Sequence, residues 1–467
     1  MDIIETLRGI VGSTHVLTGA DAAPFAQDWT GAYRGEPICA VRPADTGEVA
    51  AVVKAAAAAG IAVVPVAGNT GLMGGTHAPG RIALSLERMN RIREIREGAR
   101  IAIVEAGVVL TQLHEAADQH GLVFPLTFGA KGSARIGGVL GTNAGGSNVL
   151  RYGNTRALCL GLEVVMPDGQ VLNTMSELMK DNSGYDLRDM FIGAEGTLGI
   201  VTAAVMRLHP KPLAYATAMV AVPSVADALG LLNRLQSATG GAVEAFEYMP
   251  RSYFEGWTKR EPDKRPPFET TYDHAIMVEV GATAPRDATP NETGEIPIQA
   301  YLEEVLGEMI EAGTALDATV ARSEAQRREI WERREIAGEL SLGAGPFVLT
   351  DVSVPLDRVE PFLDRAYAAL EADDPDVRHL LVSHLGDGNL HLTVWPSDGD
   401  DGYERVMEIV EDIVQEMGGS FSAEHGIGLG KRGAMARRKD KVALEVMGKI
   451  KAALDPQGIM NPGKVLP

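Results

Sequence analysis

The sequence predicts an α+β fold with two main domains, because helices alternate with strands and some of the strands form hairpins. The chain has 467 residues, which is too long for one ordinary hydrophobic core. Two apolar runs, 160–166 and 170–173, flank the turn Pro167-Asp168-Gly169, and Asp387-Gly388 lies between apolar residues in the same way. Antiparallel hairpins mixed with helices favour an α+β fold over a regular doubly wound sheet.

The first 211 residues are expected to hold a short helical lead-in (1–35) and then a domain spanning residues 36–211. A helix is expected at 46–59, with Thr46 as a candidate N-cap and Gly60 as its stop. Further strands are expected at 38–42, 61–66, 101–105 and 200–208, with a second helix at 109–121.

The character of the sequence changes near Pro212, where we place the domain boundary, so residues 212–467 form a second domain. Polar, Pro-rich stretches at 258–271 and 284–297 are expected to be surface loops. The other elements expected in this half are strands at 216–222, 348–354, 380–385 and 390–394, a helix at 225–239, a largely helical stretch at 298–336, and helices at 403–417 and 441–454. These strands are expected to build an antiparallel sheet.

Charge and composition exclude several classes of function. The net charge of −20 disfavours nucleic acid and anionic membranes as partners. Cys39 and Cys159 are expected to be buried thiols, which fits a reducing compartment. We see neither a secretory signal nor a transmembrane segment, so a cytoplasmic protein is expected.

Three glycine-rich loops lie in the first domain, at 68–75, 129–147 and 193–200. Glycine lets the backbone approach a ligand closely, and successive backbone N–H groups suit phosphate oxygens. None of the loops has the spacing of a Rossmann or P-loop motif, which argues against ordinary nicotinamide enzymes and NTPases. One such loop is most simply turn chemistry, but three favour a large, phosphate-bearing cofactor.

The hairpin 383–391 offers a metal site. With Asp387 and Gly388 at the two turn positions, His384 lies directly opposite His391 on one face of the sheet. Glu424 and His425 follow in Ser422-Ala-Glu-His-Gly. Either histidine alone is typical of a polar hairpin, whereas the pair with Glu424 favours a site for one divalent ion.

Several motifs in the same order resemble the vanillyl-alcohol oxidase / p-cresol methylhydroxylase family, and in particular its D-2-hydroxyglutarate and D-lactate dehydrogenase branch. They are Gly68-Asn-Thr-Gly, Lys180-Asp-Asn-Ser-Gly-Tyr-Asp-Leu, Gly193-x-Glu-Gly-Thr-Leu-Gly-Ile, the 384–391 hairpin, Ser422-Ala-Glu-His-Gly-Ile-Gly and Asn461-Pro-Gly-Lys. The resemblance spans about residues 37–467. It implies a PCMH-type FAD-binding domain and a substrate domain, with the tail 455–467 returning to the flavin.

The resemblance also implies roles for the loop residues. Those expected to bind the FAD pyrophosphate are Gly68, Asn69, Thr70, Gly71 and Gly75. Those expected near the ribityl chain and flavin are Gly132, Ser133, Gly137, Gly138 and Asn143. Those expected at the adenosine end are Glu195, Gly196 and Ile200, and Asn461 is expected to return to the flavin ring. Because Ala67-Gly-Asn-Thr contains no histidine, we expect non-covalent FAD.

In the branch that this sequence resembles, the hairpin histidines and the glutamate bind zinc or a similar ion. The implied ligands here are His384, His391 and Glu424. His425 would be the base and Asn389 would help to hold the substrate. Arg334 is a candidate for binding the substrate carboxylate, although the arginines around it alternate with glutamates as on a solvated helix face.

The expected reaction is oxidation of a D-2-hydroxy acid to the 2-oxo acid, with D-2-hydroxyglutarate first and D-lactate or a related acid second. Leu349 and Gly338 depart from the dicarboxylate-specific pattern, which leaves the binding of a second carboxylate open. Zinc is the first expectation for the ion, with manganese, iron and cobalt as alternatives.

Other classes of function remain as alternatives. These are a flavin-free metallohydrolase, a flavin-binding protein without catalysis, and an oxidase of the same fold that uses oxygen. For the dehydrogenase, the expected partners are the small-molecule substrate and an electron acceptor, which could be a flavoprotein, a quinone or another carrier. A homodimer is the base-rate expectation.

Overall fold

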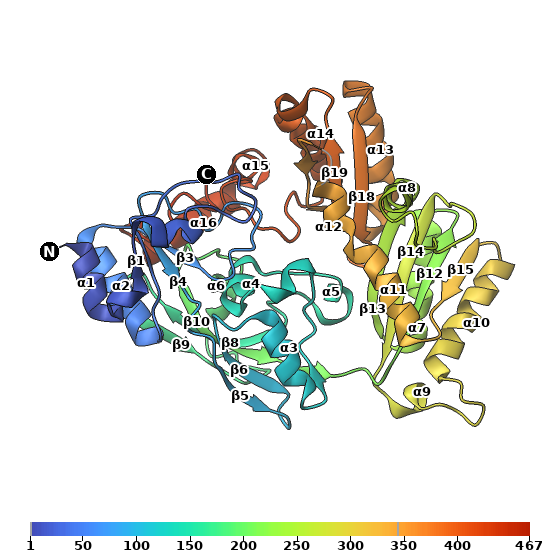
Figure 1. Ribbon diagram of the computed structural model, residues 1–467, viewed down its shortest axis with the longest axis horizontal. Coiled ribbons are helices and arrows are strands. Elements are labelled where there is room, and N and C mark those ends of the chain that lie inside the picture. The colour runs from blue at the N-terminus through green and yellow to red at the C-terminus, as the bar shows by residue number, and fades with distance from the viewer. Residues whose placement is uncertain (1, 343–344) are drawn as a thin grey trace. The chain divides into compact units, whose positions relative to one another are not determined.

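The computed structural model describes residues 2–342 and 345–467. The chain forms two compact units (Figure 1). The first unit comprises Met1–Gly145, Gly153–Pro210 and Glu424–Pro467, and the second comprises Gly146–Tyr152 and Lys211–Ala423. The last 44 residues therefore belong with the N-terminal half of the chain.

The first unit is built on two main sheets. The four-stranded sheet has the order β1-β2-β4-β3, with parallel pairing of β4 to both β2 and β3. Its strands are β1 (Val16–Leu17), β2 (Cys39–Val41), β3 (Val63–Val66) and β4 (Ile82–Ser85). The five-stranded sheet is antiparallel, in the order β5-β6-β10-β8-β9. Its strands are β5 (Ile92–Arg96), β6 (Ile101–Glu105), β8 (Cys159–Val165), β9 (Val171–Thr174) and β10 (Ile200–Arg207). A short pair, β7 (Leu122–Val123) and β11 (His209–Pro210), completes the strands.

Helices of the first unit cover these sheets. Leu7 of α1 (Ile3–Val11) and Val53 of α2 (Thr46–Ala59) form one core with Ile82 of β4. The remaining helices are α3 (Leu110–Asp118), α4 (Ile136–Thr142), α6 (Arg188–Phe191), α15 (Arg432–Arg438) and α16 (Lys441–Leu454).

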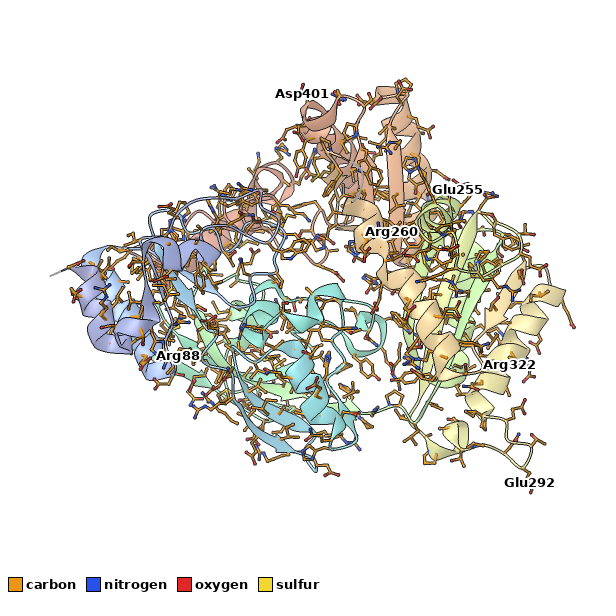
Figure 2. All side chains as sticks on the ribbon, in the orientation of Figure 1. Arg88, Glu255, Arg260, Glu292, Arg322 and Asp401 are labelled. Carbon is orange, nitrogen blue, oxygen red and sulfur yellow. The ribbon has the colours of Figure 1, made fainter. Side chains whose placement is uncertain are left out.

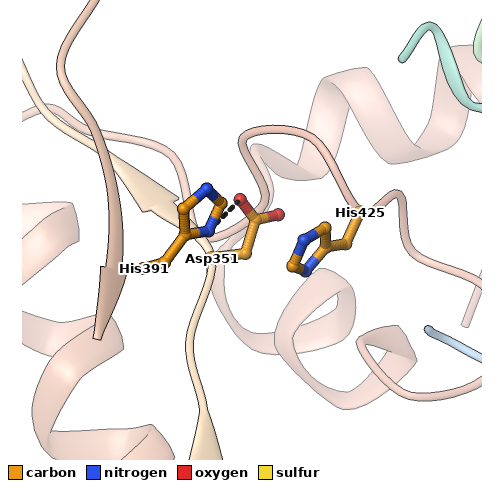
Figure 3. Close-up of side chains that lie close together, drawn as sticks. All are labelled: Asp351, His391 and His425. Carbon is orange, nitrogen blue, oxygen red and sulfur yellow. Dashed lines mark ion pairs between the residues drawn. The ribbon is translucent and has the colours of Figure 1, made fainter. Parts of the chain in front are cut away.

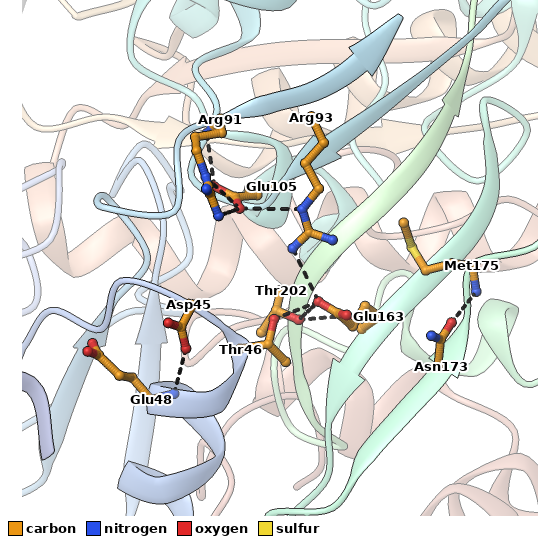
Figure 4. A network of polar contacts seen from close by, with 10 residues as sticks. All are labelled: Asp45, Thr46, Glu48, Arg91, Arg93, Glu105, Glu163, Asn173, Met175 and Thr202. Atoms are coloured by element: carbon orange, nitrogen blue, oxygen red, sulfur yellow. Dashed lines mark hydrogen bonds and ion pairs between the residues drawn. The ribbon is translucent and has the colours of Figure 1, made fainter. Parts of the chain in front are cut away.

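Buried charges on the five-stranded sheet are paired locally. The fully buried Glu105 of β6 accepts hydrogen bonds from Arg91 and Arg93 (Figure 4). Glu163 of β8 accepts from the hydroxyls of Thr46 and Thr202 (Figure 4). These contacts satisfy carboxylates that would otherwise be costly to bury.

The second unit is built on one eight-stranded antiparallel sheet. Its order is β15-β12-β14-β13-β18-β19-β16, and β17 also pairs with β19. The strands are β12 (Ala214–Val222), β13 (Val243–Pro250), β14 (His274–Ala282), β15 (Asp317–Val320), β16 (Val348–Leu349), β17 (Val352–Ser353), β18 (Arg378–His384) and β19 (Asn389–Trp395).

Side chains alternate between the two faces along each strand, so each strand contributes to a core on either face. Helices accordingly pack on both faces of this sheet. One face forms a core with α7 (Val225–Thr239), α10 (Pro297–Glu311), α13 (Val359–Asp373) and α14 (Tyr403–Glu416) (Figure 1). The other face forms a smaller core with α8 (Arg251–Arg260), α11 (Glu324–Glu335) and α12 (Ala337–Leu342). Two short helices, α5 (Val149–Tyr152) and α9 (Pro285–Ala288), complete the unit.

The mixture of helices and antiparallel sheets confirms the predicted α+β class. The predicted helix 46–59 is confirmed as α2, but its N-cap is Asp45 rather than Thr46, because the Asp45 carboxylate accepts from the Glu48 N–H. The stretch 298–336 is largely helical as predicted, but it forms two helices, α10 and α11, with a strand between them. Gly313, with φ of +74°, follows α10, and residues 317–320 then pair with β12 as the edge strand β15.

No helix among the described residues is long and apolar enough to cross a membrane.

Charged side chains such as Glu292, Arg322 and Asp401 are exposed on the second unit (Figure 2).

Candidate functional site

The glycine loops of the first unit are packed closely against one another. A Cβ atom on Gly68 would lie 2.4 Å from the carbonyl oxygen of Ser133, so the first two loops meet only because residue 68 is glycine. A Cβ on Gly137 would lie 2.9 Å from the Ala106 Cβ, and one on Gly196 would lie 2.3 Å from the Pro65 Cγ. Part of the glycine content therefore serves the packing of the chain itself.

Other glycines in these loops border open space. A Cβ on Gly71, Gly129 or Gly132 would meet no protein atom within 4 Å. None of the three has a positive φ, so backbone conformation does not require glycine there. Backbone left accessible in this way suits the close approach of a phosphate-bearing ligand, which is the fit that FAD requires.

Left-handed backbone conformations concentrate at the expected cofactor residues. Asn69 (φ 52°), Asn143 (52°), Glu195 (50°) and Asn461 (39°) are four of the six non-glycine residues with positive φ in the described part of the chain. Such conformations are costly and cluster at functional sites. The side-chain oxygen of Asn69 accepts from Thr76 Oγ1, and that of Asn143 accepts from the Arg156 N–H. Both side chains therefore bind the protein's own neighbouring segments.

Asn461 joins the C-terminal tail to two of the loops. Its side-chain amide donates to the carbonyl oxygens of Gly75 (3.1 Å) and Glu195 (2.7 Å). Its Oδ1 atom is buried and has no hydrogen-bond partner among the described residues. A buried acceptor of this kind is costly unless a ligand satisfies it, so it also fits a bound cofactor.

The remaining expected cofactor residues differ in how far they are buried. Thr70, Gly75 and Gly138 are half-buried and Ser133 is exposed. Ile200 is buried within the core of the first unit, so only its backbone can face a ligand. Burial raises the pKa of the Glu195 carboxyl, although the backbone N–H groups of Ile427 and Gly428 and the nearby Lys431 oppose that shift.

In the second unit, the hairpin brings His384 and His391 to one face of the sheet, but in a different register from the one predicted. His384 lies opposite Asn389, and His391 lies opposite Val382. Because Asn389 and His391 are two residues apart, both histidines still share a face. Their ring centroids are 5.3 Å apart, with the planes at 87°.

The register differs because Asp387-Gly388 does not form a two-residue turn. That turn requires positive φ at both positions, and Gly388 has φ of +79° whereas Asp387 is not in this region. The loop therefore spans residues 385–388. A Cβ on Gly388 would lie 2.3 Å from the Val354 carbonyl oxygen, which also holds this loop close to the segment after β17.

Each histidine has a buried carboxylate at its Nδ1 atom. His384 Nδ1 lies 2.8 Å from Glu247 Oε1, and His391 Nδ1 lies 3.8 Å from Asp351 Oδ1 (Figure 3). The side chains of Glu247 and Asp351 are fully buried. The hydrogen bond to Glu247 orients the His384 imidazole so that its other nitrogen, Nε2, is the one offered to a metal ion. His391 and Asp351 are beyond hydrogen-bond distance and lie at the separation of an ion pair.

Arg334 of α11 belongs to the same network. Its Nε donates to Glu247 Oε2 at 2.7 Å, and its side chain is 11% exposed. Burial alone would raise the pKa of Glu247, but His384 and Arg334 together hold that pKa below its usual value. The helix carrying Arg334 is fixed on the sheet by Glu279 of β14, which accepts from Arg327 and from Trp331 Nε1.

Asn389 is held at the start of β19. Its side-chain amide donates to Asp351 Oδ1 (3.1 Å) and to the Val352 carbonyl (3.0 Å). Its Oδ1 atom is buried without a hydrogen-bond partner among the residues described. Asn389 can therefore still accept a hydrogen bond from a ligand.

The chain leads from this sheet directly into Glu424 and His425. Ser420 pairs with Ser353 of β17, and the Ala423 N–H donates to the Asp351 carbonyl at 3.2 Å. Glu424 and His425 are the next two residues along the chain.

Two family models match this chain. The one described as FAD linked oxidases, C-terminal domain, matches residues 211–465, and the one described as FAD binding domain matches residues 37–175. The chain belongs to the FAD-linked oxidase family. It is an FAD-dependent oxidoreductase.

Curated relatives of this FAD-linked oxidase extend over the whole chain. A D-2-hydroxyglutarate dehydrogenase of Stutzerimonas stutzeri is 35% identical over 99% of this chain and 98% of its own length. The mitochondrial D-2-hydroxyglutarate dehydrogenase of Bos taurus is 35% identical over 100% of this chain and 84% of its own.

Solved structures share the fold at low identity. p-Cresol methylhydroxylase with bound substrate has a TM-score of 0.76 at 17% identity, covering 99% of this chain and 96% of that one. Alkyldihydroxyacetonephosphate synthase has a TM-score of 0.74 at 16% identity, covering 99% and 86%. These neighbours confirm the PCMH-type fold of this FAD-linked oxidase.

Sequence reasoning missed Glu247 and Asp351. Glu247 lies 137 positions before its partner His384, and only the pairing of β13 with β18 brings them together. Asp351 offered a signal, because a lone acidic residue within an apolar strand pattern is rarely buried without a partner. Its sequence separation from His391 gave no indication of that partner.

Proposed function

We propose that this FAD-linked oxidase oxidises a D-2-hydroxy acid to the 2-oxo acid, with D-2-hydroxyglutarate as the first candidate substrate. The observation that carries the proposal is the full-length identity of 35% to a curated D-2-hydroxyglutarate dehydrogenase. The histidine pair with its neighbouring carboxylates suits a metal ion, and the glycine loops suit FAD. The proposed reaction needs both groups. We assign cofactor binding to the first unit and substrate and metal binding chiefly to the second.

His384, His391 and Glu424 are the proposed metal ligands. The two histidines share one face of the sheet, and Glu424 is included because the sequence resembles a branch in which this glutamate joins the hairpin histidines as a ligand. Two imidazoles and one carboxylate leave coordination positions open for a substrate, as a catalytic ion requires. This donor set suits zinc first, with manganese, iron and cobalt as alternatives.

His425 is the proposed base for the substrate hydroxyl proton, since imidazole has a suitable ordinary pKa. A bound divalent ion supplies a Lewis acid that lowers the pKa of that hydroxyl, and bound FAD supplies a hydride acceptor at N5. Asn389 offers its buried Oδ1 atom to the substrate.

Arg334 is the proposed partner of the substrate carboxylate. The Nε bond to Glu247 holds its guanidinium in place. Neither of its Nη atoms has a hydrogen-bond partner among the described residues. A fixed, partly buried guanidinium is well suited to a carboxylate.

D-Lactate is the second candidate substrate, and Leu349 favours it. Leu349 pairs with Thr393, two positions after His391, so it is on the histidine face of the sheet. Gly338, the other departure from the dicarboxylate pattern, is exposed on α12. The apolar Leu349 side chain on the histidine face would suit an acid without a second carboxylate.

We further propose that FAD is bound non-covalently, that the enzyme is a homodimer, and that it is a dehydrogenase. The stretch Ala67-Gly-Asn-Thr offers no histidine for attachment. Electrons would pass to a flavoprotein, a quinone or another carrier. Cys39 and Cys159 are both buried free thiols, in keeping with the reducing cytoplasm that we propose as the location.

The test is turnover of D- and L-2-hydroxyglutarate, D-lactate and D-malate with an artificial electron acceptor, with the 2-oxo acid identified as product. We expect activity with one D-acid and loss of that activity in His391→Ala. His379→Gln is the matched control, because His379 is on the neighbouring strand β18 and stacks on Tyr367. Absence of turnover with every acid would refute the proposal.

A further inference from the structure

The loop that begins with Glu424 and His425 is tied to a buried carboxylate of the first unit. Glu195 Oε1 accepts from the Ile427 N–H at 2.7 Å, and Oε2 accepts from the Gly428 N–H at 2.8 Å. One carboxylate thus holds two successive backbone groups, the nearer of which is only two residues beyond His425.

The same loop has little room to move away from this contact. A Cβ on Gly426, whose φ is +74°, would lie 2.8 Å from Glu195 Oε1. A Cβ on Gly428, whose φ is +48°, would lie 2.0 Å from the Met73 carbonyl oxygen. That carbonyl also accepts from the Leu429 N–H at 2.7 Å. The loop is therefore held between Glu195 and the first glycine loop.

Glu195 is itself fixed by the other cofactor loops. Its N–H donates to the Gly141 carbonyl at 2.8 Å, and its own carbonyl accepts from Asn461 at 2.7 Å. Its backbone is in the left-handed region. Both oxygens of its side chain are directed to residues 427 and 428, so the side chain is occupied by the protein itself.

We infer that Glu195 is a positioning residue for His425, which it ties to the cofactor-binding loops. The inference rests on the proposed role of His425 as the base. A general base must be held within about 0.5 Å of its productive position, and a displacement of roughly 1 Å can cost about 100-fold in rate. Glu195 thereby sets the position of the base relative to the loops that receive the flavin.

The test compares Glu195→Gln with Glu163→Gln in the FAD-saturated enzyme. Glutamine keeps the size of the side chain but places an NH₂ group against one of the two N–H donors. Glu163 is the matched control, because it is a part-buried glutamate of the same unit whose partners Thr46, Arg93 and Thr202 are on other elements (Figure 4).

For Glu195→Gln we expect kcat to fall roughly 10- to 100-fold, with KM and flavin content close to those of the wild type. We also expect amide hydrogen exchange across residues 424–430 to become roughly tenfold faster. Glu163→Gln should change neither quantity. Unchanged exchange and kcat would overturn the inference, as would loss of flavin with kcat restored at saturating FAD.

Two further measurements keep the outcomes separable. If Glu195→Gln does not fold, Gly426→Ala disturbs the same contact from the loop side and should give the same pair of effects. If His425→Ala retains full activity, the base assignment fails, whereas the hydrogen exchange in Glu195→Gln still reports whether the carboxylate holds the loop.

Discussion

Replacing Glu247 by glutamine removes the one charge that His384 and Arg334 share. Glu247 is fully buried and lies 2.8 Å from His384 Nδ1 and 2.7 Å from Arg334 Nε. Breaking a buried ion pair costs about 3–5 kcal/mol when one partner is truncated. Because glutamine keeps the volume and one acceptor oxygen, we expect a loss of about 2–3 kcal/mol of unfolding free energy.

The same substitution should weaken metal binding. A carboxylate that orients a metal-binding histidine contributes roughly 10- to 100-fold to metal affinity. The assay is competition for Zn²⁺ between the folded protein and a chromophoric chelator, with urea unfolding measured in parallel. We expect both the metal affinity and the stability of Glu247→Gln to fall.

Glu279→Gln is the matched control for this prediction. Glu279 is also buried on the sheet of the second unit, and it accepts from Arg327, Trp331 and Thr217 rather than from a histidine. It should lose a similar amount of stability while metal affinity stays within about twofold, since no metal ligand contacts it. Equal loss of metal affinity in both variants would refute the reasoning, because the effect would then be one of general stability.

The remaining predictions concern the flavin and pH. Gly71→Ala should leave the stability of the apoprotein unchanged but weaken FAD binding, measured by fluorescence titration, because its Cβ meets no protein atom; unaltered FAD affinity would contradict this. Acid precipitation should release all flavin into the supernatant, and flavin that stays on the protein would show covalent attachment. Burial raises the pKa of Asp387 to about 6 in the folded protein. The buried carboxyl is therefore protonated below that pH, and the folded protein loses stability as the pH rises from about 4, the ordinary pKa of aspartate, through about 6. Asp387→Asn should therefore stabilise the apoprotein at pH 7 by at most about 3 kcal/mol, with the gain vanishing towards pH 4 in urea unfolding. A gain that does not depend on pH would rule out this account of Asp387.

Local patterns in the sequence were sufficient for much of the fold. The helix α2 and its stop at Gly60 follow from an apolar run and a residue that accepts the left-handed conformation. The β8–β9 hairpin follows from Pro167-Asp168-Gly169. The β18–β19 register could not be read in the same way, because Gly386 and Gly388 of the connecting loop pack against Leu150 and Val354, which are distant in the sequence.

The same distinction between local and distant contacts applies to the residues of the candidate site. His384, His391 and Asn389 belong to one hairpin, so sequence spacing alone could place them on one face. Glu247 and the contact of Glu195 with residues 427 and 428 join segments more than 100 positions apart. No spacing rule reaches across such separations, since those contacts are set by strand order and loop packing.

The measurement that tests the central claim most directly is an anaerobic flavin spectrum of the metal-loaded protein. Each of D- and L-2-hydroxyglutarate, D-lactate and D-malate is added separately, before and after chelation of the metal. We predict that one D-acid bleaches the flavin, that its L-enantiomer does not, and that chelation abolishes the bleaching without releasing FAD. An oxidised spectrum that no acid changes would contradict the proposed reaction, and bleaching that survives chelation would contradict the role of the metal.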